Sequence, residues 1–143
     1  MKLCDIMTAP VVRIHPEETV AVAARMLEHN NIGAMPVCTH QGKLCGMLTD
    51  RDIVVRCVAA GKDPEKTSVR DVMTSRLYVG RPDMDVPMAA GLMGKEQVRR
   101  LPVMENGKLC GMVSLGDMAR KEGSSLEAGE ALSDISSALS SRE

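Results

Sequence analysis

The chain has 143 residues, 44% of them apolar and 26% charged, with a formal net charge of −1. This length suits a domain that buries its own core without a metal or disulfide, and the charge balance argues against binding nucleic acid or an anionic membrane surface. No apolar run approaches the ~20 residues of a membrane-spanning helix, and the charged amino-terminal residues do not read as a leader sequence, so we expect a cytoplasmic protein.

An apolar strand and an amphipathic helix open the chain. We expect the strand over Val11–Ile14, and Pro16 then introduces the helix with acidic residues in its first turn, where they favour the helix dipole. Apolar residues recur at helical spacing and predict the buried face of the helix, which consists of Val20, Ala23, Ala24 and Leu27. Asn30-Asn31 marks its end.

A β-hairpin and a second helix follow. The predicted strands are Ala34–Cys38 and Leu44–Thr49, joined by a turn at Gln41-Gly42. The second helix is expected over Asp50–Val58, and a loop that contains Gly and Pro, over residues 60–64, ends it.

The second half of the chain predicts the same elements again. Tyr78-Val79 is the short strand, and Asp85 and Pro87 begin a helix. The apolar face of this helix consists of Val86, Ala89, Ala90 and Met93. Asn106-Gly107 is a strong turn signal, and we expect the two strands of a hairpin on either side of it, over Arg100–Met104 and Leu109–Ser114. A closing helix is expected over Leu115–Lys121.

The two halves are copies of one unit. Asp5-Ile6-Met7-Thr8 recurs 66 residues later as Asp71-Val72-Met73-Thr74, and Lys-Leu-Cys-Gly-Met occurs at 43–47 and, 65 residues later, at 108–112. The spacing changes at the first hairpin turn, as a duplication with one inserted residue would show. We therefore predict a mixed α+β fold of two βαββα repeats, over 1–65 and 66–122, related by an approximate two-fold axis and packed sheet to sheet.

A tail over 123–143 follows the repeats. Leu132, Ile135 and Leu139 form a narrow apolar stripe at helical spacing, which predicts a short helix. The stripe fits packing on its own module, on a dimer mate or on a partner.

Each hairpin runs into its helix through the pattern G-x-x-[T/S]-x-x-D, at Gly46–Asp52 and Gly111–Asp117. One interpretation is a capping box, in which the hydroxyl and the carboxylate satisfy backbone N–H groups at the helix start. The other is a ribonucleotide site, in which free helix N–H groups and the hydroxyl bind phosphate while the carboxylate accepts from ribose hydroxyls. The occurrence of the pattern in both copies favours the second interpretation.

Composition limits how a nucleobase is held. The chain has one Tyr and no Phe or Trp, but twelve Met. A base cannot be stacked between aromatic rings, as in common single-strand binders, and must lie between aliphatic or Met side chains.

The order and duplication of these motifs resemble a pair of cystathionine-β-synthase (CBS) domains, or Bateman module, over about residues 1–121. The resemblance rests on Met35-Pro36-Val37 and Leu101-Pro102-Val103 before the hairpin turns and on G-x-x-[T/S]-x-x-D after them. It implies a regulatory module without catalysis or a required cofactor. Such modules bind AMP, ADP, ATP or a related adenosyl ligand in clefts between repeats, often as homodimers, and the output would come from a protein partner that the sequence does not identify.

The resemblance also implies two unequal clefts. In the main cleft Met47 lies against the base, Thr49 on phosphate and Asp52 on ribose. Phosphate contacts from Arg51, Arg99 and Arg100 and a wall of Leu77, Tyr78 and Val98 complete it. The second cleft is expected to bind more weakly, because it lacks these basic groups, and consists of Pro10, Val11, Ile32, Met112, Ser114 and Asp117.

The sequence favours two other functions less. A structural protein-interaction module with degenerate clefts is the main alternative. An enzyme is disfavoured, because each motif Asp has a capping role and no activated nucleophile is nearby. The five Cys form no CxxC pair and the three His lie at no ligand spacing, so we expect no metal site and interpret all five Cys as small buried residues in apolar surroundings.

Overall fold

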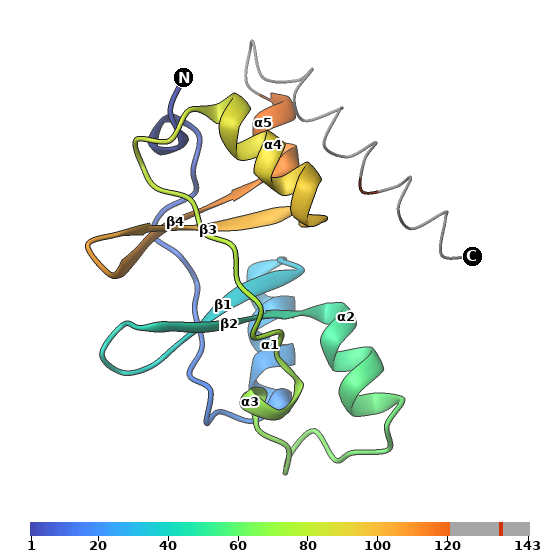
Figure 1. The fold of residues 1–143 in the computed structure, drawn as a ribbon. Helices are drawn as coiled ribbons and strands as arrows, with labels where there is room; N and C mark the ends of the chain where they lie inside the picture. Colours follow the sequence, from blue (N-terminus) through green and yellow to red (C-terminus); the bar gives the residue numbers. More distant parts are fainter. Residues whose placement is uncertain (121–134, 136–143) are drawn as a thin grey trace. The chain divides into compact units, whose positions relative to one another are not determined.

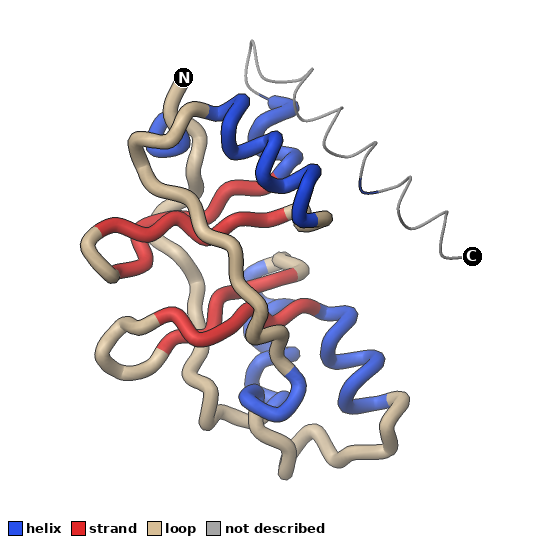
Figure 2. Tube along the Cα trace, in the orientation of Figure 1, coloured by secondary structure: helices blue, strands red, loops and turns tan. Residues whose placement is uncertain are grey.

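The computed structural model describes residues 1–120 and residue 135, and the chain divides into two compact units (Figure 1, Figure 2). One, the Thr49 unit, is the continuous segment Val12–Leu77. The other, the Ser114 unit, combines Met1–Val11 with the chain from Tyr78 onward. Each unit contains helices and one antiparallel strand pair, which confirms the predicted mixed α+β class.

The Thr49 unit contains α1 (Val20–Asn30), β1 (Ala34–Cys38), β2 (Leu44–Thr49), α2 (Asp50–Ile53), a π-helical segment (Val54–Val58) and α3 (Val69–Val72). The predicted hairpin strands are confirmed. The Thr19 hydroxyl caps α1 by accepting a hydrogen bond from Val22 N at 3.2 Å, and Asn31 ends the helix in the left-handed conformation. The predicted acidic first turn is wrong, because the helix begins only after the Thr19 cap and the acidic residues precede it.

The Ser114 unit contains a 3-10 turn (Leu3–Asp5), α4 (Val86–Glu96), β3 (Arg100–Glu105), β4 (Lys108–Ser114) and α5 (Leu115–Arg120). Asn106 and Gly107 both have positive φ, 53° and 76°, as a tight hairpin turn requires. Asp85 is the N-cap residue of α4 as predicted, but its carboxylate bonds Lys2 Nζ at 2.8 Å instead of a helix N–H group.

Each hairpin is flanked on both edges by a single bridged residue. In the Thr49 unit, β1 pairs in parallel with Ile14 and β2 in antiparallel fashion with Thr74. The Ser114 unit repeats the arrangement, with Gly80 beside Val103 of β3 and Thr8 beside Met112 of β4. The two units therefore share one strand order even though their chain connections differ.

The expected strands over Val11–Ile14 and Tyr78-Val79 are wrong, since only the bridges at Ile14 and Gly80 form. Proline explains both failures. Ile14 N donates to Pro36 O at 3.1 Å, and the next bond of a parallel ladder would need the N–H that proline lacks. In the other unit Gly80 N donates to Pro102 O at 2.8 Å, with the same consequence.

The repeated D-[I/V]-M-T segments are exchanged between the copies. Thr74, from the second sequence repeat, makes two backbone hydrogen bonds of 2.9 Å with Met47 of the first. Thr8, from the first repeat, bonds Met112 of the second at 2.8 and 3.1 Å. The compact units are thus offset from the sequence repeats, because each hairpin is completed by a segment of the other copy.

The glycine of G-x-x-[T/S]-x-x-D makes room for the methionine of the exchanged segment. A Cβ on Gly46 would lie 2.6 Å from Met73 Sδ and 3.0 Å from Thr74 O. A Cβ on Gly111 would collide with the Met7 side chain, whose Cγ would be 2.9 Å away. Met73 therefore lies directly on the backbone of β2, and Met7 directly on the backbone of β4.

Each unit has its own apolar core. In the Thr49 unit it is formed by Ile14, Val20, Ala23, Leu27, Met35, Val37, Leu48, Ile53, Cys57, Val69, Val72 and Met73. In the Ser114 unit it is formed by Leu3, Ile6, Val86, Ala89, Ala90, Met93, Leu101, Val103, Val113, Leu115, Met118 and Ile135. The predicted face of α4 is confirmed. In α1 the predicted burial of Ala24 is wrong, because this residue is exposed. Ala21 is buried instead, since its N–H donates to Pro64 O and the loop around Pro64 covers the first turn of the helix.

Three further sequence expectations concern the cysteines, the membrane and the tail. Cys38 and Cys57 are buried and Cys45 and Cys110 are half-buried, but Cys4 is exposed on the 3-10 turn, so the predicted burial of all five is wrong for Cys4. Within the described part of the chain no helix has the length and apolar character to cross a membrane. The predicted tail helix lies outside the described residues except for Ile135, which is 4% exposed in the core of the Ser114 unit.

We expect Gly46→Ala to lower the free energy of unfolding by about 1–3 kcal/mol, because the added methyl group must displace Met73 or the backbone at Thr74. Gly91→Ala is the matched control in α4: nothing lies within 4 Å of its added Cβ, so the change should be neutral or stabilising by up to ~1 kcal/mol. Urea unfolding measures both, and equal stability of Gly46→Ala and the native chain would contradict the close packing.

The Lys2–Asp85 pair ties the amino terminus to the start of α4 and predicts a pH dependence. The Lys2 ammonium lowers the pKa of the Asp85 carboxyl, and Asp85 raises the pKa of Lys2. The stabilisation is therefore present above the ordinary Asp pKa of about 3.9, is lost as pH falls through the lower folded-state value, and is lost again as pH rises above about 10.4 through the folded-state pKa of Lys2.

Lys2→Met should therefore lower the midpoint of thermal unfolding near neutral pH in low salt, and the deficit should shrink as acid protonates the Asp85 carboxyl. A deficit that persists unchanged at low pH would show that the lysine acts through its aliphatic chain instead.

Candidate functional site

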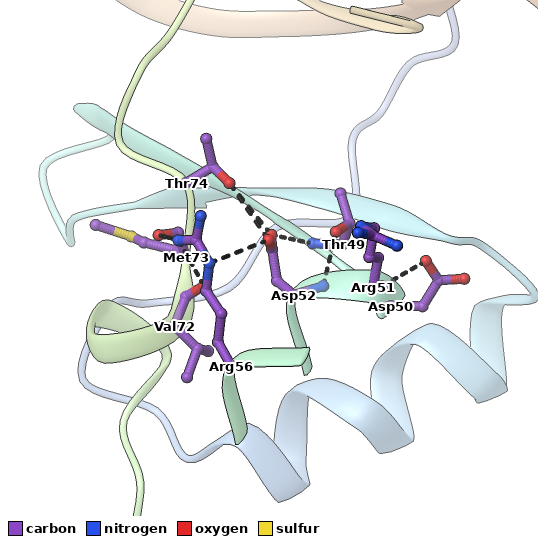
Figure 3. A network of polar contacts seen from close by, with 8 residues as sticks. All are labelled: Thr49, Asp50, Arg51, Asp52, Arg56, Val72, Met73 and Thr74. Atoms are coloured by element: carbon purple, nitrogen blue, oxygen red, sulfur yellow. Dashed lines mark hydrogen bonds and ion pairs between the residues drawn. The ribbon is translucent and has the colours of Figure 1, made fainter. Parts of the chain in front are cut away.

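The Thr49 unit carries a complete capping box at the junction of β2 and α2 (Figure 3). Asp52 N donates to Thr49 Oγ1 at 3.0 Å, and Thr49 N donates to Asp52 Oδ2 at 3.0 Å. The pattern produces this geometry because residues three apart meet at a helix start. The capping interpretation of the motif is thus realised in the structure, and any ligand role of Asp52 must be compatible with it.

Asp52 also contacts residues outside the motif. Its side chain is 11% exposed, and Thr74 Oγ1 lies 3.4 Å from Oδ1 and 3.5 Å from Oδ2. Arg56 Nε lies 3.9 Å from Oδ1, one helical turn further along. We name these four residues, Thr49, Asp52, Arg56 and Thr74, the Asp52 network. Figure 3 shows the carboxylate at its centre.

The Ser114 unit repeats the capping box but not the network. Asp117 N donates to Ser114 Oγ at 3.0 Å, and Ser114 N donates to Asp117 Oδ2 at 2.8 Å. The second oxygen, Oδ1, accepts directly from Arg120 of the same helix. Both Asp117 oxygens are therefore engaged, one of them by a charge-assisted hydrogen bond, which is the stronger kind.

The expected free N–H groups at the start of α2 are occupied. Asp50 N donates to Gly33 O at 2.9 Å, and Arg51 N donates to the Asp50 carboxylate at 2.8 Å. Since Asp52 N is bonded to Thr49, the prediction of an open helix N-terminus for phosphate is wrong here. The Thr49 hydroxyl uses only its oxygen in the cap, so its hydrogen is still able to bond an acceptor.

The structure places the predicted site residues in both units. The Thr49 unit holds Met47, Thr49, Arg51, Asp52, Leu77 and also Ile32, which was assigned to the second cleft. The Ser114 unit holds Pro10, Val11, Tyr78, Val98, Arg99, Arg100, Met112, Ser114 and Asp117. Within the Thr49 unit Met47 is half-buried and pairs with Thr74, Arg51 is exposed, and Leu77 lies at the end of the segment.

Arg99 and Arg100 lie beside the Ser114 motif within their own unit. Arg100 pairs with Ser114 in the hairpin, and the Arg99 carbonyl accepts from Leu115 N at 3.0 Å. Both arginines are exposed. Sequence analysis assigned them to the Thr49 cleft and expected the Ser114 motif to lack basic groups. Their grouping with Thr49 joins residues of two units and stays a prediction, whereas their proximity to Ser114 is a property of the hairpin.

Three residues of the two sites escaped sequence analysis. Thr74 was recognised only as part of a repeat, and its place beside Asp52 follows from the exchange of segments. Arg56 and Arg120 lie four and three residues after their aspartates, a helical spacing at which opposite charges meet. Both arginines could have been predicted from that spacing, whereas no nearby residue in the sequence indicates the contact of Thr74 with Asp52.

Other groups that could support chemistry are few in the described residues. Burial raises the pKa of the Cys38 and Cys110 thiols, which disfavours the reactive thiolate. The His15 and His40 rings pack with centroids 3.7 Å apart. Among residues 1–120 and 135, no group of three His, Cys, Asp or Glu side chains is arranged to hold a metal ion.

Comparison with known proteins accounts for the repeated units and their motifs. The profile of the CBS domain matches residues 3–58 and 69–123. The chain belongs to the CBS domain family. It is a CBS domain pair, as the duplication and the two small antiparallel sheets had indicated.

Relatives of this CBS domain pair cover most of its length. The CBS domain-containing protein YhcV of Bacillus subtilis is 44% identical over 132 residues, 92% of this chain and 93% of its own. Hypoxic response protein 1 of Mycobacterium tuberculosis is 37% identical over 116 residues, 81% of each chain. The crystal structure of Hypoxic Response Protein I with two coordinated zinc ions matches at a TM-score of 0.77, with 36% identity, 84% of this chain and 98% of that one covered.

One structural relative contains adenosine-derived ligands. The CBS domain pair of protein MJ0100, in complex with 5′-methylthioadenosine and S-adenosyl-L-methionine, matches at a TM-score of 0.75 with 26% identity. The match covers 84% of this chain and 94% of that one. A fold like that of this chain therefore holds adenosyl ligands in at least one relative.

Thr49→Ala should lower the free energy of unfolding by about 0.5–2 kcal/mol, because it removes the cap acceptor for Asp52 N. Thr49→Ser is the matched control and should retain most of the stability, since Ser114 makes the same bond at 3.0 Å in the other unit. Chemical denaturation compares the two variants. If Ser is as damaging as Ala, the lost stability comes from the methyl group rather than from the cap.

Proposed function

We propose that this CBS domain pair is a non-catalytic regulatory module that binds an adenine nucleotide or related adenosyl ligand, with Asp52 accepting from the ribose hydroxyls. The observation that carries the proposal is the Asp52 carboxylate, fixed at the junction of β2 and α2 with one oxygen committed to the cap and the other only loosely engaged. Oδ2 accepts from Thr49 N at 3.0 Å, whereas the contacts of Oδ1 are 3.4 and 3.9 Å long.

A carboxylate with one loosely engaged oxygen can accept hydrogen bonds from the two hydroxyls of a ribose. An ionised carboxylate offers about four lone-pair positions and accepts only, so Oδ1 retains capacity for hydroxyl donors after the cap is made. The side chain is pre-oriented by the cap, which reduces the conformational entropy lost on binding. Thr49, whose hydroxyl hydrogen is free, is the neighbouring donor for a phosphate oxygen.

The ligand class rests on three supports. The family match places the chain among CBS domains, and a relative of 26% identity binds 5′-methylthioadenosine and S-adenosyl-L-methionine. The half-buried Met47 next to the junction offers an apolar surface for a base in a chain that has no Phe or Trp. AMP, ADP and ATP share the adenosine portion and are the first ligands to test.

The non-catalytic part of the proposal is supported by what the site residues already do. Asp52 and Asp117 are both engaged in capping boxes, and desolvation raises the pKa values of the Cys38 and Cys110 thiols. Neither arrangement provides an activated nucleophile or a proton-transfer group. A module of this kind acts by binding its ligand more tightly in one conformation than in another.

The proposal includes assembly and location. We expect a homodimer that acts on a protein partner, in the cytoplasm. The five thiols are free, as is usual in a reducing compartment. A structural relative, a CBS-CP12 protein from bloom-forming cyanobacteria, is hexameric, so assembly beyond one chain occurs among proteins of this fold.

Thermal unfolding with AMP, ADP, ATP, 5′-methylthioadenosine or S-adenosyl-L-methionine tests the function. A ligand at about 100 times its Kd should stabilise the native chain by about 2.7 kcal/mol. Asp52→Asn should reduce this effect strongly, because it keeps the size of the side chain but replaces one acceptor oxygen by a donor.

Asp117→Asn is the matched control and should bind nearly as well as the native chain, since Arg120 already engages the Asp117 carboxylate. Absence of any shift in the native chain would remove the ligand proposal and favour a protein-interaction module. Equal losses in both variants would show that Asp52 is not the principal site.

A further inference from the structure

We propose that Arg56 is a positioning residue that, with Thr74, couples the Asp52 carboxylate to the docked segment Val72–Thr74. Occupation of Asp52 would then change how firmly this segment is held. The ligand part of the inference rests on the proposed function, whereas the coupling itself is a property of the chain without ligand.

Arg56 bridges two groups that the sequence separates. Its Nη1 donates to Met73 O at 3.0 Å and approaches Val72 O at 3.5 Å, while its Nε lies 3.9 Å from Asp52 Oδ1. The carbonyls lie at the carboxyl end of α3, where unpaired oxygens carry partial negative charge. A planar guanidinium with donors on different edges can serve both groups, and a lysine ammonium could not do so in the same way.

Thr74 forms the second link. Its backbone pairs with Met47 of β2 through two bonds of 2.9 Å, and its hydroxyl faces Asp52 at 3.4 Å. The segment is therefore held by β2, by Arg56 and by Asp52 at once. Figure 3 shows the contacts with Arg56 and Asp52. A change at the carboxylate reaches it by two routes.

The links through Arg56 and through Thr74 both involve Asp52 Oδ1, the oxygen that the proposed ligand would use. Arg56 and Thr74 each have their shortest Asp52 contact with Oδ1, at 3.9 and 3.4 Å. Hydroxyl donors from a ligand must share this oxygen or displace the protein groups. Since a ligand shifts only states that it binds unequally, this competition is the physical basis for a response in the segment.

The segment has a special place in the chain. After Thr74 the backbone runs through Leu77, where the Thr49 unit ends, and enters the Ser114 unit at Tyr78. A change in the docking of Thr74 therefore acts on one of the two covalent connections between the units, the other being the bond from Val11 to Val12. The Asp52 network is placed where ligand binding can be transmitted along the chain.

The Ser114 unit does not have this coupling in its described part. Asp117 pairs with Arg120 of its own helix, and among the described residues the Thr8 side chain makes no hydrogen bond to Asp117. Position 121, the counterpart of Arg56 in the repeat, lies outside the described residues. Arg120→Gln is therefore an internal control for loss of an arginine beside a motif aspartate.

Amide hydrogen exchange at Thr74, whose N–H bonds Met47 O, tests the coupling without any ligand. Arg56→Gln and Asp52→Asn should each speed exchange at this amide by about tenfold, the size expected for loss of one charge-assisted hydrogen bond. The double variant should speed exchange by less than the product of the two single effects, because part of each effect passes through the shared contact between Asp52 and Arg56. Multiplying effects in the double variant, or an equal effect of Arg120→Gln, would overturn the proposal.

Saturating AMP, or the adenosyl ligand that stabilises the native chain most, provides the second arm. Exchange at Thr74 should change on binding in the native chain, whereas Arg56→Gln should bind with similar affinity and show no such change. Binding without a response at Thr74 in the native chain would refute the ligand coupling. If no adenosyl ligand binds, the proposed function fails, while the ligand-free comparison still decides whether Arg56 links Asp52 to the segment.

Discussion

The structure depends on the docking of a short methionine-bearing segment against the glycine of a hairpin strand. Met73 and Met7 lie where a side chain on Gly46 or Gly111 would have to be, and the adjacent threonines close the edge of each sheet with paired backbone bonds. Because an unpaired strand edge exposes backbone groups, this docking completes the sheet as well as the core. The docked segment stabilises β2 or β4, and the hydroxyl and aspartate of G-x-x-[T/S]-x-x-D lie at the end of that strand.

Sequence analysis was accurate where structure is determined by near neighbours. The boundaries of β1 and β2, the Asn106-Gly107 turn and the apolar face of α4 follow from turn chemistry and periodicity, and all are confirmed. It failed where a distant group decides. The edge strands stop because Pro36 and Pro102 lack an N–H, and Ala21 rather than Ala24 is buried because a loop beyond residue 63 covers the helix.

The contacts of the candidate site also divide into local ones that were predicted and distant ones that were not. The pairing of Thr49 with Asp52 is a contact between residues three apart, so the motif alone predicted it. The occupied N–H groups of α2 and the contact of Thr74 with Asp52 depend on Gly33 and on the exchanged segment, which no local pattern reveals. The cap does not exclude the proposed ligand role of Asp52, since it uses one carboxylate oxygen and fixes the orientation of the other.

The exchange of segments also sets an order of assembly during synthesis. The Thr49 unit is one continuous stretch, so all of its contacts are available once Leu77 has left the ribosome. The Ser114 unit requires Thr8 to pair with Met112, which is made about a hundred residues later. The segment that carries Leu3, Ile6 and Thr8 therefore lacks its partner strand until Met112 has been synthesised, and the continuous unit can fold before that point.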